Sequence, residues 1–190
     1  EKQRQQLLET IADASKRMER IIGNLLDTAR LESGMLQLKL DWCDLEDVVS
    51  GALRRSKEHT QSYKIKVEIA DDLPLIYADA ALLEHVVLNL LDNAVKYSGQ
   101  NPKIKIQSKE NSKGLVLKFT DNGCGIPESD LPFVFDKFYR VAREDSKDIE
   151  GFGIGLSYVK RVCEWHKWKV EAKNNEDKGI TITIQINKND

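Results

Sequence analysis

Three polar side chains recur at helical spacing within the stretch DAALLEHVVLNLLDNAVKYS, residues 79–98. At 100° per residue, Asn89, Asn93 and Lys96 fall on one face, together with His85. Solvated helix faces usually carry Glu and Lys, whereas Asn is a poor helix former that competes for backbone hydrogen bonds. Amide carbonyl oxygens suit Mg²⁺, and a Lys beside them suits phosphate. This face is therefore either a solvated surface or a site for a metal-bound phosphate.

A second candidate is the stretch DNGCGI, residues 121–126. It places Asp121 at the end of a predicted strand, with Gly123 and Gly125 following. Glycine lets the backbone approach a flat ligand closely, and an Asp carboxylate accepts hydrogen bonds from an exocyclic amine such as that of adenine. Asp-Asn-Gly is also a common turn string, so a plain turn is the alternative.

A third candidate is GFGIGL, which presents Gly151, Gly153 and Gly155 immediately before a predicted helix. Free backbone N–H groups and the helix dipole make such a start a phosphate site. Leu156 stands where the dinucleotide fingerprint requires Gly, and no G-K-[ST] of a P-loop occurs in the chain, so both of those motifs are excluded. A flexible loop remains the alternative.

The composition is that of an ordinary globular protein, with 190 residues, 41% hydrophobic and 32% charged. A formal net charge of -2 gives no electrostatic case for nucleic acid as a partner. The sequence shows no signal peptide and no apolar run long enough to cross a bilayer. The odd number of scattered cysteines fits a reducing cytosol: Cys43, Cys124 and Cys163. We therefore expect a cytoplasmic location, and a fragment, because the chain begins with Glu inside a helical pattern.

Residues 3–33 have the pattern of a long amphipathic helix whose apolar stripe is wide enough for a helical bundle, with Gly34 as its stop. Packing on this chain's own domain is the alternative to packing on another helix. Further helices are predicted at 44–57 and 79–98, and another follows GFGIGL, residues 151–156. The alternating strands are predicted at 35–40, 64–69, 103–107, 115–120, 169–173 and 180–186.

These elements predict an α+β fold, an α/β sandwich. It should contain a mixed sheet of about five strands covered on one face by three helices, preceded by a long N-terminal stem helix.

The motifs occur in an order that resembles the sensor histidine kinases, within the superfamily shared with gyrase, the mismatch-repair ATPase and the heat-shock chaperone ATPases. NLLDNAVKYS resembles the family's N box, DNGCGI and GFGIGL its two glycine boxes, and FVFDKFYR (133–140) its F box. KGITITI (178–184) is similar to a weaker closing glycine motif. Residues 1–34 resemble the second helix of the dimerisation and phosphotransfer stem, and 35–190 the catalytic ATP-binding domain. The potassium-responsive sensor kinases are particularly similar.

The resemblance implies ATP and Mg²⁺ as ligands and assigns roles to single residues. Asn93 would be the Mg²⁺ ligand. Asn89, Lys96 and Arg140 would act on the phosphates as the catalytic residues, and Asp121 would accept from the adenine amine. The other implied nucleotide-binding residues are Tyr97, Gly123, Gly125, Ile126, Tyr139, Gly151, Phe152, Gly153, Ile154, Gly155, Leu156 and Thr181, and residues 141–150 would form a nucleotide lid.

Two departures from the family pattern affect the expected reaction. Hydrolysing relatives carry a Glu one turn before the metal-binding Asn, and this chain has Asn89 there, which cannot take a proton, so transfer is favoured over hydrolysis. The phosphoacceptor His, which an acidic residue follows, is missing, because none of the three His is a convincing acceptor: His59, His85 and His166. The usual Gly-Gly after His166 is replaced by Lys167-Trp168, so the geometry of that turn is open.

The expected function is thus transfer of the γ-phosphoryl group of ATP to a His on a stem helix missing from this chain, for relay to an Asp of a response regulator receiver domain. The implied assembly is a homodimer through the stem, and an inner-membrane anchor of the full-length protein is left open. One alternative is a non-catalytic nucleotide-binding dimerisation module. Another is an anti-sigma-type protein-serine kinase, but the long stem helix argues against this second alternative.

Overall fold

The computed structural model describes residues 37–60, 63–99, 101–142 and 151–188, together with single positions between 3 and 26. The chain divides into two compact units, Glu1–Gln37 and Leu38–Asp190. The described positions between 3 and 26 are helical, as predicted for them. The predicted stop at Gly34 lies outside the described residues. Six apolar residues of the predicted stripe are exposed: Leu7, Leu8, Ile11, Met18, Ile22 and Leu26.

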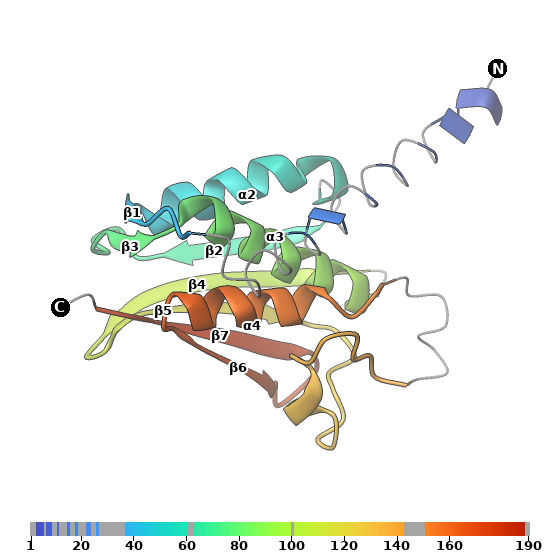
Figure 1. The fold of residues 1–190 in the computed structure, drawn as a ribbon. Helices are drawn as coiled ribbons and strands as arrows, with labels where there is room; N and C mark the ends of the chain where they lie inside the picture. The colour runs from blue at the N-terminus through green and yellow to red at the C-terminus, as the bar shows by residue number, and fades with distance from the viewer. Residues whose placement is uncertain are drawn as a thin grey trace. The chain divides into compact units, whose positions relative to one another are not determined.

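The second unit is built on a five-stranded sheet with the order β2-β4-β5-β7-β6 (Figure 1). Its strands are β2 (Lys64–Ile69), β4 (Lys103–Asn111), β5 (Gly114–Asp121), β6 (Lys169–Asn174) and β7 (Ile180–Asn187). The pair β2–β4 is parallel and the other neighbours are antiparallel. The predicted mixed sheet of five strands is therefore confirmed.

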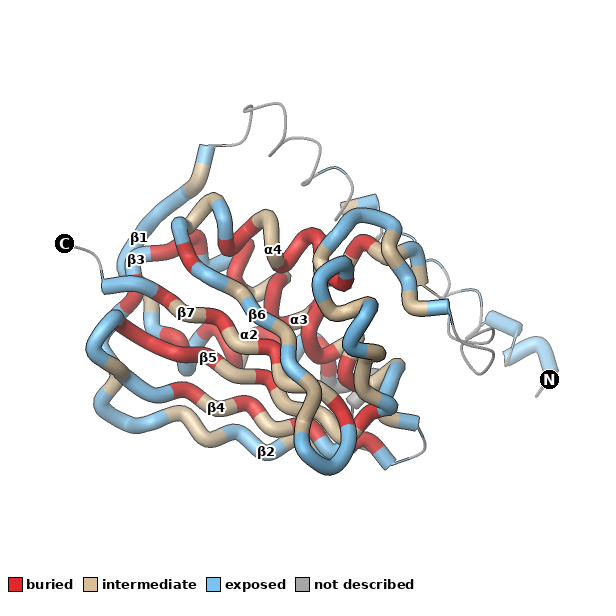
Figure 2. Tube along the Cα trace, turned by 90° about the horizontal axis from the view of Figure 1, so that it is seen from below, coloured by how far each residue is buried: buried red, intermediate tan, exposed pale blue. Residues whose placement is uncertain are grey.

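Three helices cover one face of this sheet, as predicted (Figure 1). They are α2 (Leu45–Thr60), α3 (Ala80–Tyr97) and α4 (Gly155–Trp165), and α3 packs between the other two. The buried residues gather on α3, α4 and the central strands, whereas the edge strands β2 and β6 are more exposed (Figure 2). The apolar stripe of α3 is buried as its spacing predicts: Leu82, Leu83, Val86, Val87, Leu90, Leu91 and Ala94. The polar residues of α3 are thereby fixed relative to α4.

The start of α3 is fixed by the carboxylate of Asp79, which is buried. Its Oδ1 accepts from the N–H of Leu82 at 3.2 Å, the capping contact predicted from the sequence. Its Oδ2 accepts from the N–H of Lys39 at 3.0 Å, so the first residues of the second unit are attached at the same place. At α2, Asp44 Oδ1 accepts from the N–H of Glu46 at 2.7 Å.

The strand predicted at 35–40 is wrong where it can be checked, because residues 37–40 are not in a strand. The strand β1 comes later, at Asp41–Cys43, and pairs antiparallel with β3 (Ile76–Ala78) in a separate two-stranded sheet. Alternation reports a half-buried surface and not the presence of a partner strand. The partner β3 is three residues long, and its register places it against Asp41–Cys43. The N–H of Lys39 donates to Asp79 and is not available for a strand partner.

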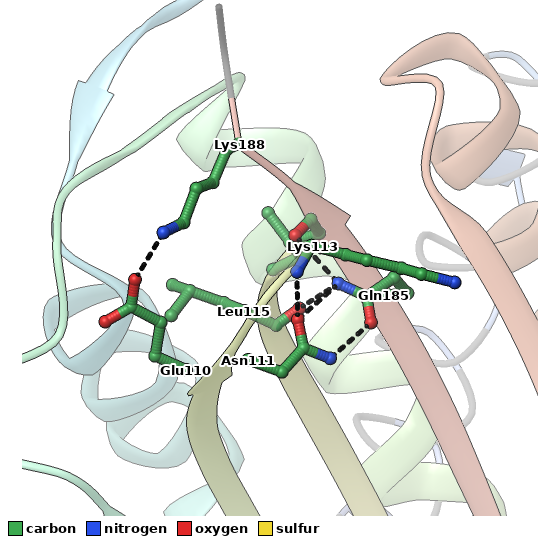
Figure 3. A network of polar contacts seen from close by, with 7 residues as sticks. Glu110, Asn111, Lys113, Leu115, Gln185 and Lys188 are labelled. Carbon is green, nitrogen blue, oxygen red and sulfur yellow. Dashed lines mark hydrogen bonds and ion pairs between the residues drawn. The ribbon is translucent and has the colours of Figure 1, made fainter.

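The predicted hairpin between β4 and β5 is confirmed, with Asn111 opposite Gly114. At this turn Asn111 Nδ2 donates to Gln185 Oε1 at 2.8 Å, and Lys188 Nζ lies 2.8 Å from Glu110 Oε1 (Figure 3). This polar network lies at the start of β5, whereas Asp121 ends the same strand, so the network and the first glycine stretch are at opposite ends of the sheet. Within the described residues, no helix combines the length and the apolar character needed to cross a membrane.

Candidate functional site

Two amide side chains of α3 converge on the first residue of α4. Asn89 is buried, and its Nδ2 donates to the carbonyl of His85 at 2.9 Å. A Cβ on Gly155 would lie 3.4 Å from Asn89 Oδ1 and 3.5–3.6 Å from the two amide atoms of Asn93. The structure therefore brings together residues of two predicted motifs that are more than 60 positions apart in the sequence.

The start of α4 lies against these amides and carries no side-chain cap. Ile154 occupies the N-cap position, makes no side-chain capping bond and is buried. The hydroxyl of Ser157 donates to the Ile154 carbonyl at 2.9 Å instead of accepting from the first N–H groups. An uncapped helix start offers backbone N–H groups and a partial positive charge to an anion. The side chain of Ile154 is part of the core, and Leu156 is half-buried.

Lys96 lies one turn beyond Asn93 on α3, and its Nζ is 2.5 Å from Asp92 Oδ2. The two side chains are partly buried, so the ion pair is only partly screened by water. A phosphate at Lys96 would compete with Asp92 for the ammonium group. The other predicted cation, Arg140, is exposed.

The F box is docked on the second glycine box. The N–H of Phe138 donates to the carbonyl of Gly153 at 2.9 Å. Gly153 has a φ of 67°, and a Cβ there would lie 2.7 Å from the Phe138 carbonyl carbon and the Tyr139 oxygen. Only glycine satisfies both the dihedral angle and the close approach. The Tyr139 hydroxyl donates to Asp130, and this bond raises the pKa of Tyr139.

Asp121 is held from two sides at the end of β5. Its Oδ1 accepts from the N–H of Gly123 at 2.8 Å and from the N–H of Ile180 at 3.3 Å. Burial raises the pKa of this carboxyl above its ordinary value, and the two N–H groups oppose that shift. Among the described residues no hydrogen bond is made to Oδ2, so one carboxylate oxygen stays available as an acceptor.

The first glycine stretch contacts the C-terminal end of α3. The N–H of Cys124 donates to the carbonyl of Tyr97 at 3.2 Å, and a Cβ on Gly123 would lie 2.7 Å from that carbonyl oxygen. Tyr97 itself is partly exposed. The helix that carries the amides thus ends at the loop that carries Asp121.

The turn between β6 and β7 contributes residues that the sequence analysis missed. Asn175 Nδ2 donates to the carbonyl of Asp121 at 2.9 Å, and Asn175 Oδ1 accepts from Thr181 Oγ1 at 2.7 Å. Thr181 Oγ1 also lies 2.9 Å from Thr120 Oγ1. Asn174 makes two hydrogen bonds to the backbone of Ile126. The signal in the sequence is the adjacent Asn pair directly after the strand predicted at 169–173.

The remaining predicted residues are placed as follows. Apart from its chain neighbours, no described residue comes within 4 Å of a Cβ built on Gly151, and Phe152 is exposed. Gly125 lies beside Asn174 Oδ1, where a Cβ would be at 3.1 Å. Of the predicted lid at 141–150, residues 143–150 lie outside the described residues.

His166 uses both ring nitrogens within the fold. Its Nε2 accepts from the N–H of Asp79 at 3.0 Å, so Nδ1 carries the proton toward the carbonyl of Val162 at 2.8 Å. Burial lowers the pKa of His166. The turn that follows is closed by Lys167 with a φ of 57°, the left-handed conformation usual for glycine.

Residues 78–190 match the family described as "Histidine kinase-, DNA gyrase B-, and HSP90-like ATPase". The sensor protein KdpD of Clostridium acetobutylicum is 36% identical over 188 residues, which cover 99% of this chain and 21% of the relative. KdpD of Escherichia coli is 35% identical over 167 residues, 88% of this chain and 18% of the relative. The chain therefore spans about a fifth of the length of these curated relatives.

Among solved structures, the mycobacterial sensor histidine kinase MprB superimposes with a TM-score of 0.69 at 27% identity. The match covers 77% of this chain and 97% of that one. Three observations agree on the family of this chain. They are the sheet with three helices on one face, the glycine stretches that contact α3, and the family match over more than half of the chain. This chain belongs to the histidine kinase-, DNA gyrase B- and HSP90-like ATPases, and its relatives are sensor histidine kinases.

Proposed function

We propose that this chain binds ATP with Mg²⁺ and donates the γ-phosphoryl group to a His imidazole on a stem helix outside the chain. The observation that carries the proposal is the convergence of Asn89 and Asn93 on the uncapped start of α4 at Gly155. Amide oxygens on one side and backbone N–H groups on the other are suited to a metal-bound phosphate chain.

The donor set at Gly155 fits Mg²⁺. Its oxygen donors are hard, neutral and few, and Mg²⁺ in proteins keeps several waters and shares its remaining positions with substrate phosphates. Asn93 would hold the ion, with Asn89 beside it. When bound, Mg²⁺ neutralises charge on the phosphate oxygens. Lys96 supplies a further positive charge. To bind the phosphates, its ammonium group would give up its contact with Asp92.

Asp121 is suited to an adenine amine. Two backbone N–H groups fix the orientation of its carboxylate through Oδ1, and Oδ2 remains an acceptor. Guanine presents a carbonyl oxygen where adenine presents an amine, and a carboxylate repels it. We therefore expect ATP to bind more tightly than GTP.

The reaction proposed is transfer and not hydrolysis. An imidazole nitrogen of the acceptor bonds to the γ-phosphorus, the bond from that phosphorus to the β–γ bridging oxygen breaks, and ADP leaves with the electron pair. The second ring nitrogen of the acceptor then gives up its proton to water. Asn89 cannot take a proton from an attacking water, and its Nδ2 is bonded to the His85 carbonyl. Positioning and charge neutralisation are the main demands of such a step.

The wider protein is proposed from the relatives' names. Residues 1–34 would be the second helix of a dimerisation stem, and the acceptor His would lie on its partner helix. The phosphoryl group would pass on to a response regulator receiver domain. Because the relatives named KdpD are larger sensor proteins, the proposed setting of this chain is the cytoplasmic kinase part of such a protein.

The test is titration of the chain with ATP, with and without Mg²⁺. Asn93→Ala and Asp121→Ala should each weaken ATP binding by about tenfold or more, since each removes a polar contact to a charged or buried group. Asn111→Ala, in the network at the far end of the sheet (Figure 3), is the matched control and should bind as the wild type does. If Asn93→Ala and Asp121→Ala both kept wild-type affinity, the site assignment would be wrong.

Transfer is tested separately by adding a stem helix pair that carries the His. Acid-labile phosphate on that stem supports the proposed kinase. Binding of ATP without transfer to the stem would favour a non-catalytic module, and acid-stable phosphate on Ser would favour a serine kinase.

A further inference from the structure

The backbone of Ile126 is held by one side chain at the end of β6, Asn174. Asn174 Oδ1 accepts from the N–H of Ile126 at 2.8 Å, and Asn174 Nδ2 donates to the carbonyl of Ile126 at 2.6 Å. The same Nδ2 lies 3.0 Å from Glu128 Oε1. The Asn174 amide thus bonds both the N–H and the carbonyl of Ile126, as the backbone of a neighbouring strand would do in a sheet.

The strand order explains why this contact matters. Asp121 ends β5 and Asn174 ends β6, and β7 lies between these strands. The five residues after Asp121 therefore run across the start of β7 and are anchored beyond it, on β6. Two interstrand spacings are about 10 Å, which this length of chain can span. The loop with Gly123 and Gly125 is thus fixed at its far end by Asn174.

The other end of this loop is fixed independently. Cys124 donates to the Tyr97 carbonyl at the end of α3, and Gly123 donates to Asp121 Oδ1. Asn175 Nδ2 adds a bond to the Asp121 carbonyl at 2.9 Å. Asn122 Oδ1 also accepts from the N–H of Lys103 at 2.8 Å, and Asn122 Nδ2 donates to the Asn101 carbonyl at 3.1 Å. Between these bonds and the anchor at Asn174, two glycines give the backbone conformational freedom.

We propose that Asn174 is a positioning residue for adenine recognition, because it fixes the Gly123–Ile126 backbone at the distance from Asp121 that an adenine ring requires. The inference rests on the proposed ATP site. Asn174 itself need not touch the nucleotide. It acts through Ile126, and losing it lets the loop move away from Asp121.

The sharpest variant is Asn174→Asp, which keeps the size of the side chain and the acceptor for the Ile126 N–H. It replaces the donor by an oxygen that faces the Ile126 carbonyl and Glu128. We expect ATP binding to weaken by about tenfold, as for the loss of a partly buried hydrogen bond and its replacement by repulsion. We also expect the preference for ATP over GTP to shrink, because the loop no longer holds the base against Asp121.

A general loss of stability would not produce this pattern, since it would lower ATP and GTP binding together. Asn111→Asp is the matched control: it makes the same change in an amide that bonds Gln185, at the other end of the sheet (Figure 3). The thermal midpoint of each nucleotide-free variant shows that it is folded. Asn174→Ser, whose shorter hydroxyl does not reach both backbone groups, provides a milder change if Asn174→Asp does not fold.

Hydrogen exchange of the Ile126 amide provides a measurement without nucleotide, and it should be faster in Asn174→Ser than in the wild type. Weaker ATP binding with reduced base preference in the Asn174 variants, and neither in Asn111→Asp, supports the inference. Unchanged ATP affinity and base preference in folded Asn174 variants would overturn it and leave the proposed ATP site standing. If the wild type bound no ATP, the proposed function would fail and this inference with it.

Discussion

The substitution Gly155→Ala should affect the stability of the chain and its affinity for ATP in opposite directions. Gly155 is the first residue of α4, and an added Cβ would meet Asn89 Oδ1 at 3.4 Å and the Asn93 amide at 3.5–3.6 Å. These are ordinary van der Waals distances, so the free chain accommodates the methyl group. Replacing a helical glycine by alanine typically stabilises a protein by about 0.4–1 kcal/mol. For a chain of this size, that raises the thermal midpoint by about 1–4 °C.

The same methyl group would stand between the two amides and the first N–H groups of α4, where the phosphates and Mg²⁺ are proposed to bind. Charge-assisted hydrogen bonds are worth about 1.5–3 kcal/mol each, so displacing one of them weakens ATP binding by about 10- to 150-fold. The expected result is a chain that is as stable as the wild type or more stable, and that binds ATP poorly. Calorimetric titration with ATP and Mg²⁺, together with thermal unfolding of the free chain, measures both quantities.

Gly51→Ala is the control for this experiment. Gly51 lies within α2, and a Cβ there would meet Glu84 Cδ at 3.7 Å, again an ordinary contact. It should raise the thermal midpoint and leave ATP binding unchanged. Wild-type ATP affinity in Gly155→Ala would refute the placement of the phosphates at the start of α4. A large loss of stability would instead refute the interpretation of the local packing.

Two further predictions concern single residues of the same unit. Because burial raises the pKa of Asp121, its charged form destabilises the free chain above that pKa; Asp121→Asn should therefore raise the thermal midpoint at pH 7–8 while it abolishes the preference for ATP over GTP. This gain in stability should disappear in thermal unfolding below about pH 4, the ordinary range of Asp, where the carboxyl is protonated in both states. Lys167→Gly should stabilise the chain by about 0.5–1 kcal/mol, since Lys167 has a φ of 57°, and unfolding in urea should show it. The same change at Lys169, within β6, should be destabilising.

The central helix could be predicted from the sequence because every signal for it is local. Asp79 provides its N-cap, and the apolar stripe from Leu83 to Ala94 repeats at helical spacing. The small sheet could not be predicted in the same way. The strand Ile76–Ala78 is too short for periodicity to show, and its partner at Asp41–Cys43 is defined only by long-range pairing.

In the candidate site, too, local features could be predicted from the sequence and long-range contacts could not. Residue type and spacing were enough to nominate Asn89, Asn93 and Asp121 as candidate site residues. The contacts of Asn174 and Asn175 were not predictable, because they join positions 48 and 54 residues apart in the sequence. In a turn string, an Asn that bonds its neighbours looks the same as an Asn that bonds a distant strand.

The glycines of the motifs fall into two physical classes, and this division decides which of them report on a ligand. A Cβ on Gly179 would lie 2.0 Å from the Asp121 carbonyl oxygen, and one on Gly153 would lie 2.7 Å from Phe138, so the fold itself requires glycine at both positions. Loss of ATP binding in variants of these two would show only that the loops had moved. Among the described residues, nothing comes closer than an ordinary contact to a Cβ built on Gly151 or Gly155, so those residues do not require glycine at either position. The proposed phosphate site would explain why glycine stands at both positions, and substitutions there therefore test that proposal directly.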